Sequence, residues 1–183
     1  FPNLRSLRAT GGGILIRGLD LPHLERLFIE TGGLPAGSLR GITASNLPAL
    51  EDLEVWLGSS EYGAGATIDE LAPLLSARNT PQLKRLAIKN GEFMGEVAQA
   101  LAATPLLALL ESLDLSMGTM RDSGAQVLLD NSAYFAALKH LSVAENYLSH
   151  GMCAQLEAAF PGIDVGGQRI ARDDQLVYTS VGE

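Results

Sequence analysis

A short leucine pattern recurs along the chain and constrains its fold more than any other feature. In the stretch LKHLSVAEN, which begins at Leu138, the first, fourth and sixth positions are apolar and Asn146 is the ninth residue. This spacing is neither helical nor simply alternating. The apolar side chains all point inward only if a short strand begins near residue 140 and a sharp turn follows it near Asn146.

Five earlier units share this register. They are LRSLRATGG, LERLFIETG, LEDLEVWLG, LKRLAIKNG and LESLDLSMG, which start at Leu4, Leu24, Leu50, Leu83 and Leu110. Successive starts lie between 20 and 33 residues apart, and a period of this size is typical of stacked repeat architectures. A single unit cannot bury its apolar edge, whereas a stack buries a continuous ribbon of leucines. We therefore predict a solenoid over residues 1–165, with six full units and a shortened seventh at FPGIDV, and a C-terminal capping tail over 166–183 that covers the last unit.

The pattern L-x-x-L-x-L-x-x-N-x-L resembles the leucine-rich repeat family, and the long units with helices resemble its ribonuclease-inhibitor-like subclass. The chain's ending, with ENYLS, FPGIDV and TSVGE, is similar to uncharacterised bacterial cytoplasmic leucine-rich repeat proteins. The resemblance implies an α/β leucine-rich repeat solenoid. Its curved parallel sheet would line the concave side, and helices and 3₁₀ turns would line the convex side.

The connections between the strands fall into two classes. Between residues 10 and 50 they are short and rich in glycine and proline, so we expect extended or 3₁₀ segments. After residue 66 the apolar spacing predicts helices within 67–78, 95–104, 121–131 and 149–160. Thr67 and Glu70 have the spacing of a capping box, and Pro73 should bend the helix that follows or delay its start.

Glycine replaces the family's asparagine at the ninth position of most units. Asparagine and glycine both tolerate a left-handed backbone, so the turn can be kept while most of the side-chain ladder is lost. We therefore predict a positive φ at Gly58, Gly91 and Gly118, and tolerance of asparagine at these positions.

Composition excludes several classes of partner. A formal charge of −8 opposes binding to nucleic acid and to anionic membranes, but it is compatible with a basic protein partner. No apolar run has the length of a membrane span, and no signal-peptide pattern is seen at the N-terminus. The single cysteine, Cys153, allows no internal disulfide, which favours a cytoplasmic setting and a packed structural thiol.

No pattern of catalytic or metal-binding residues is found. His23, His140 and His150 are scattered, without paired ligands at metal spacing, and neither G-x-S-x-G nor H-E-x-x-H occurs. We therefore predict no enzymatic activity, no cofactor and no metal.

The third, fifth and seventh positions of each unit should point away from the leucine core, toward the concave side. Most of these residues are polar or small, but Phe28 and Trp56 are large aromatic residues in adjacent units. Exposed aromatic residues with charges around them are typical of binding hot spots. The predicted partner-binding site is Phe28, Trp56, Arg26, Glu54, Arg85 and Lys89. In the competing interpretation, residues 58–66, with Tyr62, fold back and cover Trp56.

The predicted function is non-catalytic recognition of a protein partner by the concave face. Because Phe1 begins in mid-pattern without a polar cap, an alternative is the C-terminal repeat region of a larger bacterial protein. Its effector or enzymatic domain would lie upstream of residue 1. A purely structural spacer is a third possibility.

Overall fold

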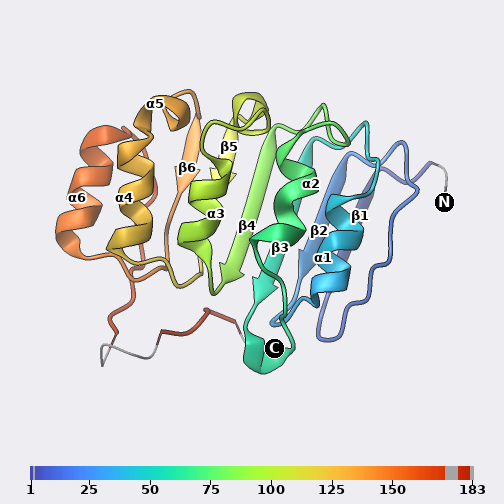
Figure 1. The fold of residues 1–183 in the computed structure, drawn as a ribbon, viewed down its shortest axis with the longest axis horizontal. Helices are drawn as coiled ribbons and strands as arrows, with labels where there is room; N and C mark the ends of the chain where they lie inside the picture. The colour runs from blue at the N-terminus through green and yellow to red at the C-terminus, as the bar shows by residue number, and fades with distance from the viewer. Residues whose placement is uncertain (2, 172–176, 182–183) are drawn as a thin grey trace.

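A computed structural model describes residues 1, 3–171 and 177–181 of the chain. They form a mixed α/β structure built on a six-stranded sheet whose strands follow one another in chain order (Figure 1). Every neighbouring pair is parallel. The strands are β1 (Ser6–Thr10), β2 (Arg26–Glu30), β3 (Asp52–Gly58), β4 (Arg85–Gly91), β5 (Ser112–Asp114) and β6 (His140–Ser142). The predicted α/β class and parallel sheet are confirmed.

The strands pair in the register that the leucine pattern predicts. Third positions face one another across all six strands, in the order Ser6, Arg26, Asp52, Arg85, Ser112 and His140. The fourth-position leucines form the next row. Beyond β6, Ser142 forms a parallel bridge with Asp164, and the Val143 amide donates to the Asp164 carbonyl at 2.8 Å. The FPGIDV segment therefore continues the same pairing for one shortened unit.

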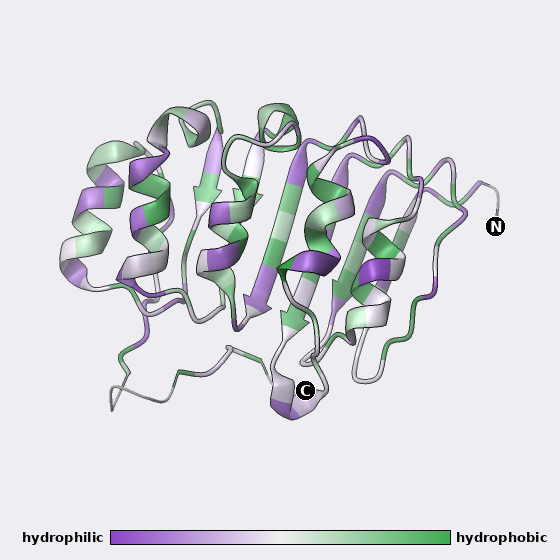
Figure 2. Ribbon diagram, viewed as in Figure 1, coloured by the Kyte–Doolittle hydropathy of each residue, from purple (hydrophilic) through white to green (hydrophobic). Residues whose placement is uncertain are grey.

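The α-helices lie on one side of the sheet (Figure 1). They are α1 (Ala36–Thr43), α2 (Ala72–Leu75), α3 (Met94–Leu101), α4 (Asp122–Asp130), α5 (Ser132–Phe135) and α6 (His150–Ala159). The 3₁₀ segments are η1 (Ser60–Tyr62), η2 (Ile68–Leu71) and η3 (Leu107–Leu109). The hydropathy colouring alternates along β3 and β4, as expected for strands with one face in the core (Figure 2).

Helix α1 was not expected, because Gly37 and Gly41 lower helix propensity in this glycine-rich segment. Tertiary contacts explain the helix. The Ser38 hydroxyl accepts the Ile16 amide at 3.1 Å and donates to the Ile14 carbonyl at 3.0 Å. A Cβ at Gly41 would lie 2.3 Å from the Ile16 carbonyl oxygen, so this glycine permits the close approach of the preceding segment. Between β1 and β2, residues 11–25 contain no helix, as predicted.

The capping box and the effect of Pro73 are both observed. The Thr67 side chain caps η2 while Glu70 accepts the Thr67 amide at 2.8 Å. Helix α2 begins only at Ala72, with Pro73 in its first turn, where a missing N–H removes no helical bond. Glu70 also accepts from Arg40 at 2.7 Å, which ties η2 to α1. The Thr67 amide and the Arg40 guanidinium lower the pKa of Glu70 to about 2.

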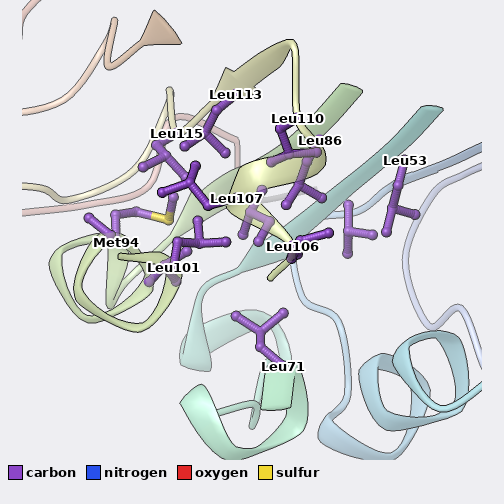
Figure 3. Close-up of a cluster of buried hydrophobic side chains, with 14 of the residues drawn as sticks. Leu53, Leu71, Leu86, Met94, Leu101, Leu106, Leu107, Leu110, Leu113 and Leu115 are labelled. Carbon is purple, nitrogen blue, oxygen red and sulfur yellow. The ribbon is translucent and has the colours of Figure 1, made fainter. Parts of the chain in front are cut away.

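Leucines from successive units fill the space between the sheet and the helices (Figure 3). Leu86 and Leu113, at the fourth position of interior units, are each 1% exposed. Cys153 is buried on α6, as predicted, and its burial raises the pKa of the thiol. At the other end, Leu7 on β1 is only partly buried.

The turn prediction is right at Gly58 and wrong at Gly91 and Gly118. Gly58 has φ +76°, but neither of the other two adopts a left-handed φ. In these later units the left-handed residue is at the eighth position, at Asn90 (φ 56°), Met117 (φ 65°) and Glu145 (φ 53°).

Gly91 and Gly118 are required for space instead. A Cβ at Gly118 would lie 2.3 Å from Met94 Cγ and 2.9 Å from the Gly91 carbonyl oxygen. Asparagine should therefore not be tolerated there, contrary to the expectation from sequence. Asn146 makes the backbone bonds expected of an asparagine at the ninth position, because its side-chain amide donates to the Leu115, Val143 and Ala144 carbonyls at 2.9–3.1 Å.

The predicted C-terminal tail has two described parts. Residues 166–169 bond to the last units, where the Glu145 amide donates to the Gly166 carbonyl at 2.8 Å and the Arg169 amide donates to the Asn146 carbonyl at 2.7 Å. Residues 177–181 return along the C-terminal ends of β4, β5 and β6 (Figure 1). The reason lies in the turns, which offer carbonyls and the Asn90 amide as hydrogen-bonding partners there. Residues 172–176 and 182–183 of the predicted tail lie outside the described residues.

Within the described part of the chain, no helix combines the length and the apolar character needed to cross a membrane. The same residues contain no cluster of three or more histidine, cysteine or acidic side chains that could hold a metal ion.

Candidate functional site

The sheet face that the helices leave uncovered is called the open face here. It is formed by the third, fifth and seventh positions of the strands, and the opposite positions are buried from β2 onward. All six residues predicted as the binding site lie on the open face, on β2, β3 and β4. The strand register therefore places them side by side.

Trp56 lies in the middle of a compact polar cluster. Its indole Nε1–H donates to Glu54 Oε1 at 2.6 Å, and the Lys89 ammonium lies 5.7 Å from the centre of the Trp56 ring. Lys89 is also 3.8 Å from Glu54 Oε1 and 3.6 Å from Asp114 Oδ2. The Lys89 and Glu54 side chains are only 17% and 22% exposed, so this ion pair is partly shielded from solvent. The cluster holds the partly buried Trp56 ring in one orientation.

Phe28 has a similar arrangement one strand away. The Arg8 guanidinium on β1 stacks over the Phe28 ring, 4.6 Å from its centre, and forms an ion pair with Glu30. Thr10 donates to the same carboxylate at 3.0 Å. Both predicted aromatic residues are therefore partly covered by a cation from the neighbouring strand.

The remaining two predicted residues, Arg26 and Arg85, flank Asp52 in the third-position row. Arg85 Nε donates to Asp52 Oδ2 at 3.0 Å. Arg26 is exposed and makes no ion pair with any described residue. This leaves Arg26 as the predicted site residue whose charge is open to a partner.

The competing interpretation, in which residues 58–66 cover Trp56, is not supported by the contacts. This segment packs beside the end of β2 instead. The Ser59 amide donates to the Gly32 carbonyl at 2.8 Å, and a Cβ at Gly33 would lie 2.0 Å from the Tyr62 carbonyl oxygen. The Tyr62 side chain is 52% exposed. The Lys89 ammonium lies over the Trp56 ring, and Glu54 accepts from its Nε1–H.

Three residues that contact the predicted site residues or their partners on the open face were not among the predicted site residues: Arg8, Glu30 and Asp114. Arg8 pairs with Phe28 in the strand register, and Asp114 lies one strand beyond the Lys89 side chain that it contacts. All three occupy fifth or seventh positions. The repeat register could have found them if every outward position next to an aromatic residue or a lysine had been included.

Charge on the open face is balanced. The cationic residues at its outward positions are Arg8, Arg26, Arg85 and Lys89, and the anionic ones are Glu30, Asp52, Glu54 and Asp114. Four positive and four negative charges cancel. The formal charge of −8 is therefore carried by other parts of the chain.

Comparison with known proteins gives a structural relative but no family. No family model matches the sequence, and no curated protein matches it. A crystal structure of a protein from Bacteroides fragilis is similar, with a TM-score of 0.80 and 33% sequence identity. The match covers 87% of this chain and 44% of the other. This chain therefore spans less than half the length of that protein.

Proposed function

We propose that this chain is a leucine-rich repeat solenoid that recognises a protein partner through the open face and does no chemistry. The repeated leucine register supports the solenoid. Each of the six units supplies one parallel strand, and the leucines of successive units form continuous buried rows. In this proposal the sheet curves, and the open face is its concave side.

The observation that carries the binding proposal is the arrangement around Trp56 and Phe28. Two partly exposed rings lie on adjacent strands, each beside a cation that is itself paired with a carboxylate. Aromatic residues and arginine contribute most of the binding free energy at protein interfaces. Because the charges are already held in place by one another, a partner would lose little side-chain entropy on docking.

The balanced charge of this face defines the partner more closely. A strongly basic partner would be drawn to the acidic surface elsewhere, not to the open face. We infer a partner surface of mixed charge with an apolar centre that covers the two rings, and an acidic group that pairs with Arg26. A basic partner, as the overall charge suggested, gains no support from this face.

A second candidate function follows from the length comparison. The match covers 44% of the Bacteroides fragilis protein, so the similar region is one part of a longer chain in that protein. We propose as the alternative that it is the C-terminal repeat region of a larger bacterial protein with an effector or enzymatic domain upstream. The full reading frame distinguishes the two proposals, since a catalytic motif ahead of residue 1 would favour the second. The single buried cysteine supports a cytoplasmic location in either case.

Affinity capture from a lysate of the source cell tests the open face. The wild-type chain should retain a partner that Phe28→Ala and Trp56→Ala both lose. Tyr134→Ala is the matched control, because Tyr134 is an exposed aromatic residue on the helical side, 53% exposed on α5.

Trp56 is the only tryptophan, so its fluorescence reports directly on the site. Adding the captured partner to the wild-type chain should shift its emission. If the wild type and the Phe28→Ala, Trp56→Ala and Tyr134→Ala variants all fold in a thermal melt and capture the partner equally, the binding site lies elsewhere.

A further inference from the structure

The C-terminal segment 177–181 is bound at the end of the sheet through its main chain. Asn90 Nδ2 donates to the Val181 carbonyl at 2.7 Å, and the Val181 amide donates to Asn90 Oδ1 at 2.9 Å. The Ser180 amide donates to the Met117 carbonyl at 3.1 Å. These bonds would form with any residue type at positions 180 and 181 that has a backbone N–H.

Tyr178 is held in the same way. The Tyr147 hydroxyl accepts the Tyr178 amide at 3.0 Å and donates to the Tyr178 carbonyl at 3.1 Å, while Arg169 Nη1 donates to that carbonyl at 2.6 Å. The Tyr178 side chain is 52% exposed. We call Asn90, Met117, Tyr147 and Arg169 the tail site; it makes hydrogen bonds to five backbone groups of the segment.

The tail site is held in place by contacts that do not involve the segment. Arg169 Nε donates to the Glu145 carbonyl at 3.1 Å, its other terminal nitrogen bonds the Gly118 carbonyl, and its guanidinium lies 4.5 Å from the centre of the Tyr147 ring. Asn90 is fully buried, and its main-chain N–H donates to the Ser116 carbonyl at 3.1 Å. The receptor groups are therefore positioned before the segment binds, which reduces the entropy lost on binding.

The chain's own segment does not fit this site fully. The Ser180 hydroxyl is buried and has no hydrogen-bond partner among the described residues. Leaving a buried hydroxyl unpaired costs free energy that an alanine or glycine at this position would not lose. A peptide with a small apolar residue here would therefore bind the same backbone positions more tightly than residues 177–181 do.

We propose that the tail site is a binding site for an extended peptide of a protein partner, recognised through its main chain, and that residues 177–181 occupy it until such a peptide displaces them. The preferred peptide carries alanine or glycine where Ser180 lies. This site is at the ends of β4–β6, whereas the proposed partner on the open face lies over β2–β4. The two proposals therefore stand or fall separately.

A labelled peptide tests the proposal in the full chain. The probe is fluorescein-Val-Tyr-Thr-Ala-Val-amide, which matches residues 177–181 with alanine in place of Ser180. In the wild-type chain the tethered segment competes at an effective concentration on the order of millimolar. Ser180→Pro removes the N–H that bonds Met117 and frees the site. Fluorescence anisotropy should show the probe binding this variant at least about tenfold more tightly than the wild type.

Matched glycine variants in the Ser180→Pro chain identify the receptor groups. Asn90→Gly keeps the left-handed backbone but removes the amide, so probe binding should weaken about tenfold. Ala103→Gly is the control, because Ala103 also has a left-handed φ of 58° and no contact with the tail site. Tyr147→Phe, which keeps the ring beneath Arg169 and removes the hydroxyl, should weaken binding severalfold.

Two results would overturn the proposal: probe binding to Ser180→Pro that is no tighter than to the wild type, or equal binding to the Asn90→Gly and Ala103→Gly chains. If Asn90→Gly fails to fold in a thermal melt, Tyr147→Phe decides in its place. Trp56→Ala should leave probe binding unchanged, which keeps this outcome separate from that of the open face.

Discussion

The turn after β3 and the turns after β4, β5 and β6 reverse the chain in different ways. After β3, Gly58 is left-handed at the ninth position and packs directly on the Gly32–Gly33 backbone. In the later units the left-handed residue has moved to the eighth position and carries a side chain, as at Asn90 and Glu145. The first arrangement needs glycine for its φ. After β4 and β5 the second uses the following glycine, Gly91 or Gly118, only for close packing, and after β6 Asn146 takes that place.

The contacts between neighbouring helices also differ between the N-terminal and C-terminal halves of the chain. In the N-terminal half, α1 and η2 are joined by polar contacts, with Arg40 bonded to Glu70 and the Thr43 hydroxyl donating to the Glu70 carbonyl at 2.6 Å. In the C-terminal half, α3 and α4 approach through Gly95 and Gly124, where a Cβ on either would lie 2.9 Å from the other's Cα. The same leucine register is therefore found beneath helices joined by polar side chains and beneath helices joined by close glycine contacts. Loss of a charged or polar group should affect the first pair, and an added Cβ should affect the second.

The leucine core is common to both halves, so its loss should have the largest effect. Leu86→Ala and Leu113→Ala should each lower the free energy of unfolding by roughly 2–5 kcal/mol, because each side chain is only 1% exposed. Leu7→Ala, on the partly buried edge strand β1, is the matched control and should cost less than either. Urea unfolding measures all three; a loss below about 1 kcal/mol at both interior sites would mean that these leucines do not support the stack.

Gly58→Ala separates the two kinds of turn. The new Cβ would lie 2.0 Å from the Gly32 carbonyl oxygen, on a backbone with φ +76°. Left-handed strain and overpacking against backbone together predict a loss of roughly 2–4 kcal/mol.

Gly118→Ala is the comparison for that variant. A Cβ there would lie 2.3 Å from Met94 Cγ, on a flexible side chain, and 2.9 Å from the Gly91 carbonyl oxygen, a smaller overlap with backbone than at Gly58. A loss of about 1–2 kcal/mol is therefore expected by urea unfolding. Equal losses at Gly58 and Gly118 would contradict the distinction between a turn that needs a left-handed glycine and one that needs only space.

Much of the sheet could be predicted from the sequence, because apolar periodicity fixes which side chains face the core and therefore the strand register. The same register placed Trp56 beside Lys89. The hand of each turn could not be predicted in this way, since Met117 and Glu145 are not residues that favour a left-handed φ. After Met117, the Gly118 backbone packs against Met94 and Gly91, and after Glu145, the buried Asn146 side chain bonds three carbonyls; neither contact can be read from a local pattern.

Long-range polar contacts were also beyond the sequence pattern. Asn90 and Val181 are 91 residues apart, and no local spacing links them. Helix α1 was missed for a related reason. Its glycines lower the helix propensity, but the close contact that favours the helix involves residues 16 and 17, one unit earlier. Local patterns predicted the register of the strands, but they gave no information on which distant residues pack against the turns.

Acid should weaken the contact between Glu70 on η2 and Arg40 on α1. The pKa of Glu70 lies near 2, below the ordinary value of 4.5, so its ionised form stabilises the fold. That contribution is complete above about pH 4.5 and is lost as the pH falls toward 2. Glu70→Gln should cost about 1–2 kcal/mol at pH 7 and progressively less below pH 4.5.

Urea unfolding of this variant and the wild type across that range gives the comparison. Glu96→Gln is the control, because Glu96 is an exposed carboxylate in the first turn of α3. A cost for Glu70→Gln that stays constant from pH 7 to pH 2 would show that the charge on Glu70 does not contribute.

The smallest predicted effect has the opposite sign and tests the C-terminal turns. Glu145 is exposed, its φ is 53°, and its backbone rather than its side chain makes the bonds to Gly166 and Arg169. Glycine at this position removes the left-handed strain, worth roughly 1–2 kcal/mol, but adds freedom to the unfolded chain. The net gain in unfolding free energy should be about 0.5–1 kcal/mol. Glu157→Gly, an exposed site inside helix α6, should instead lose about 1 kcal/mol. If both glycine variants lose stability to the same extent in thermal and urea unfolding, the eighth-position turn is unstrained, and the two halves of the molecule differ less than their backbone angles indicate.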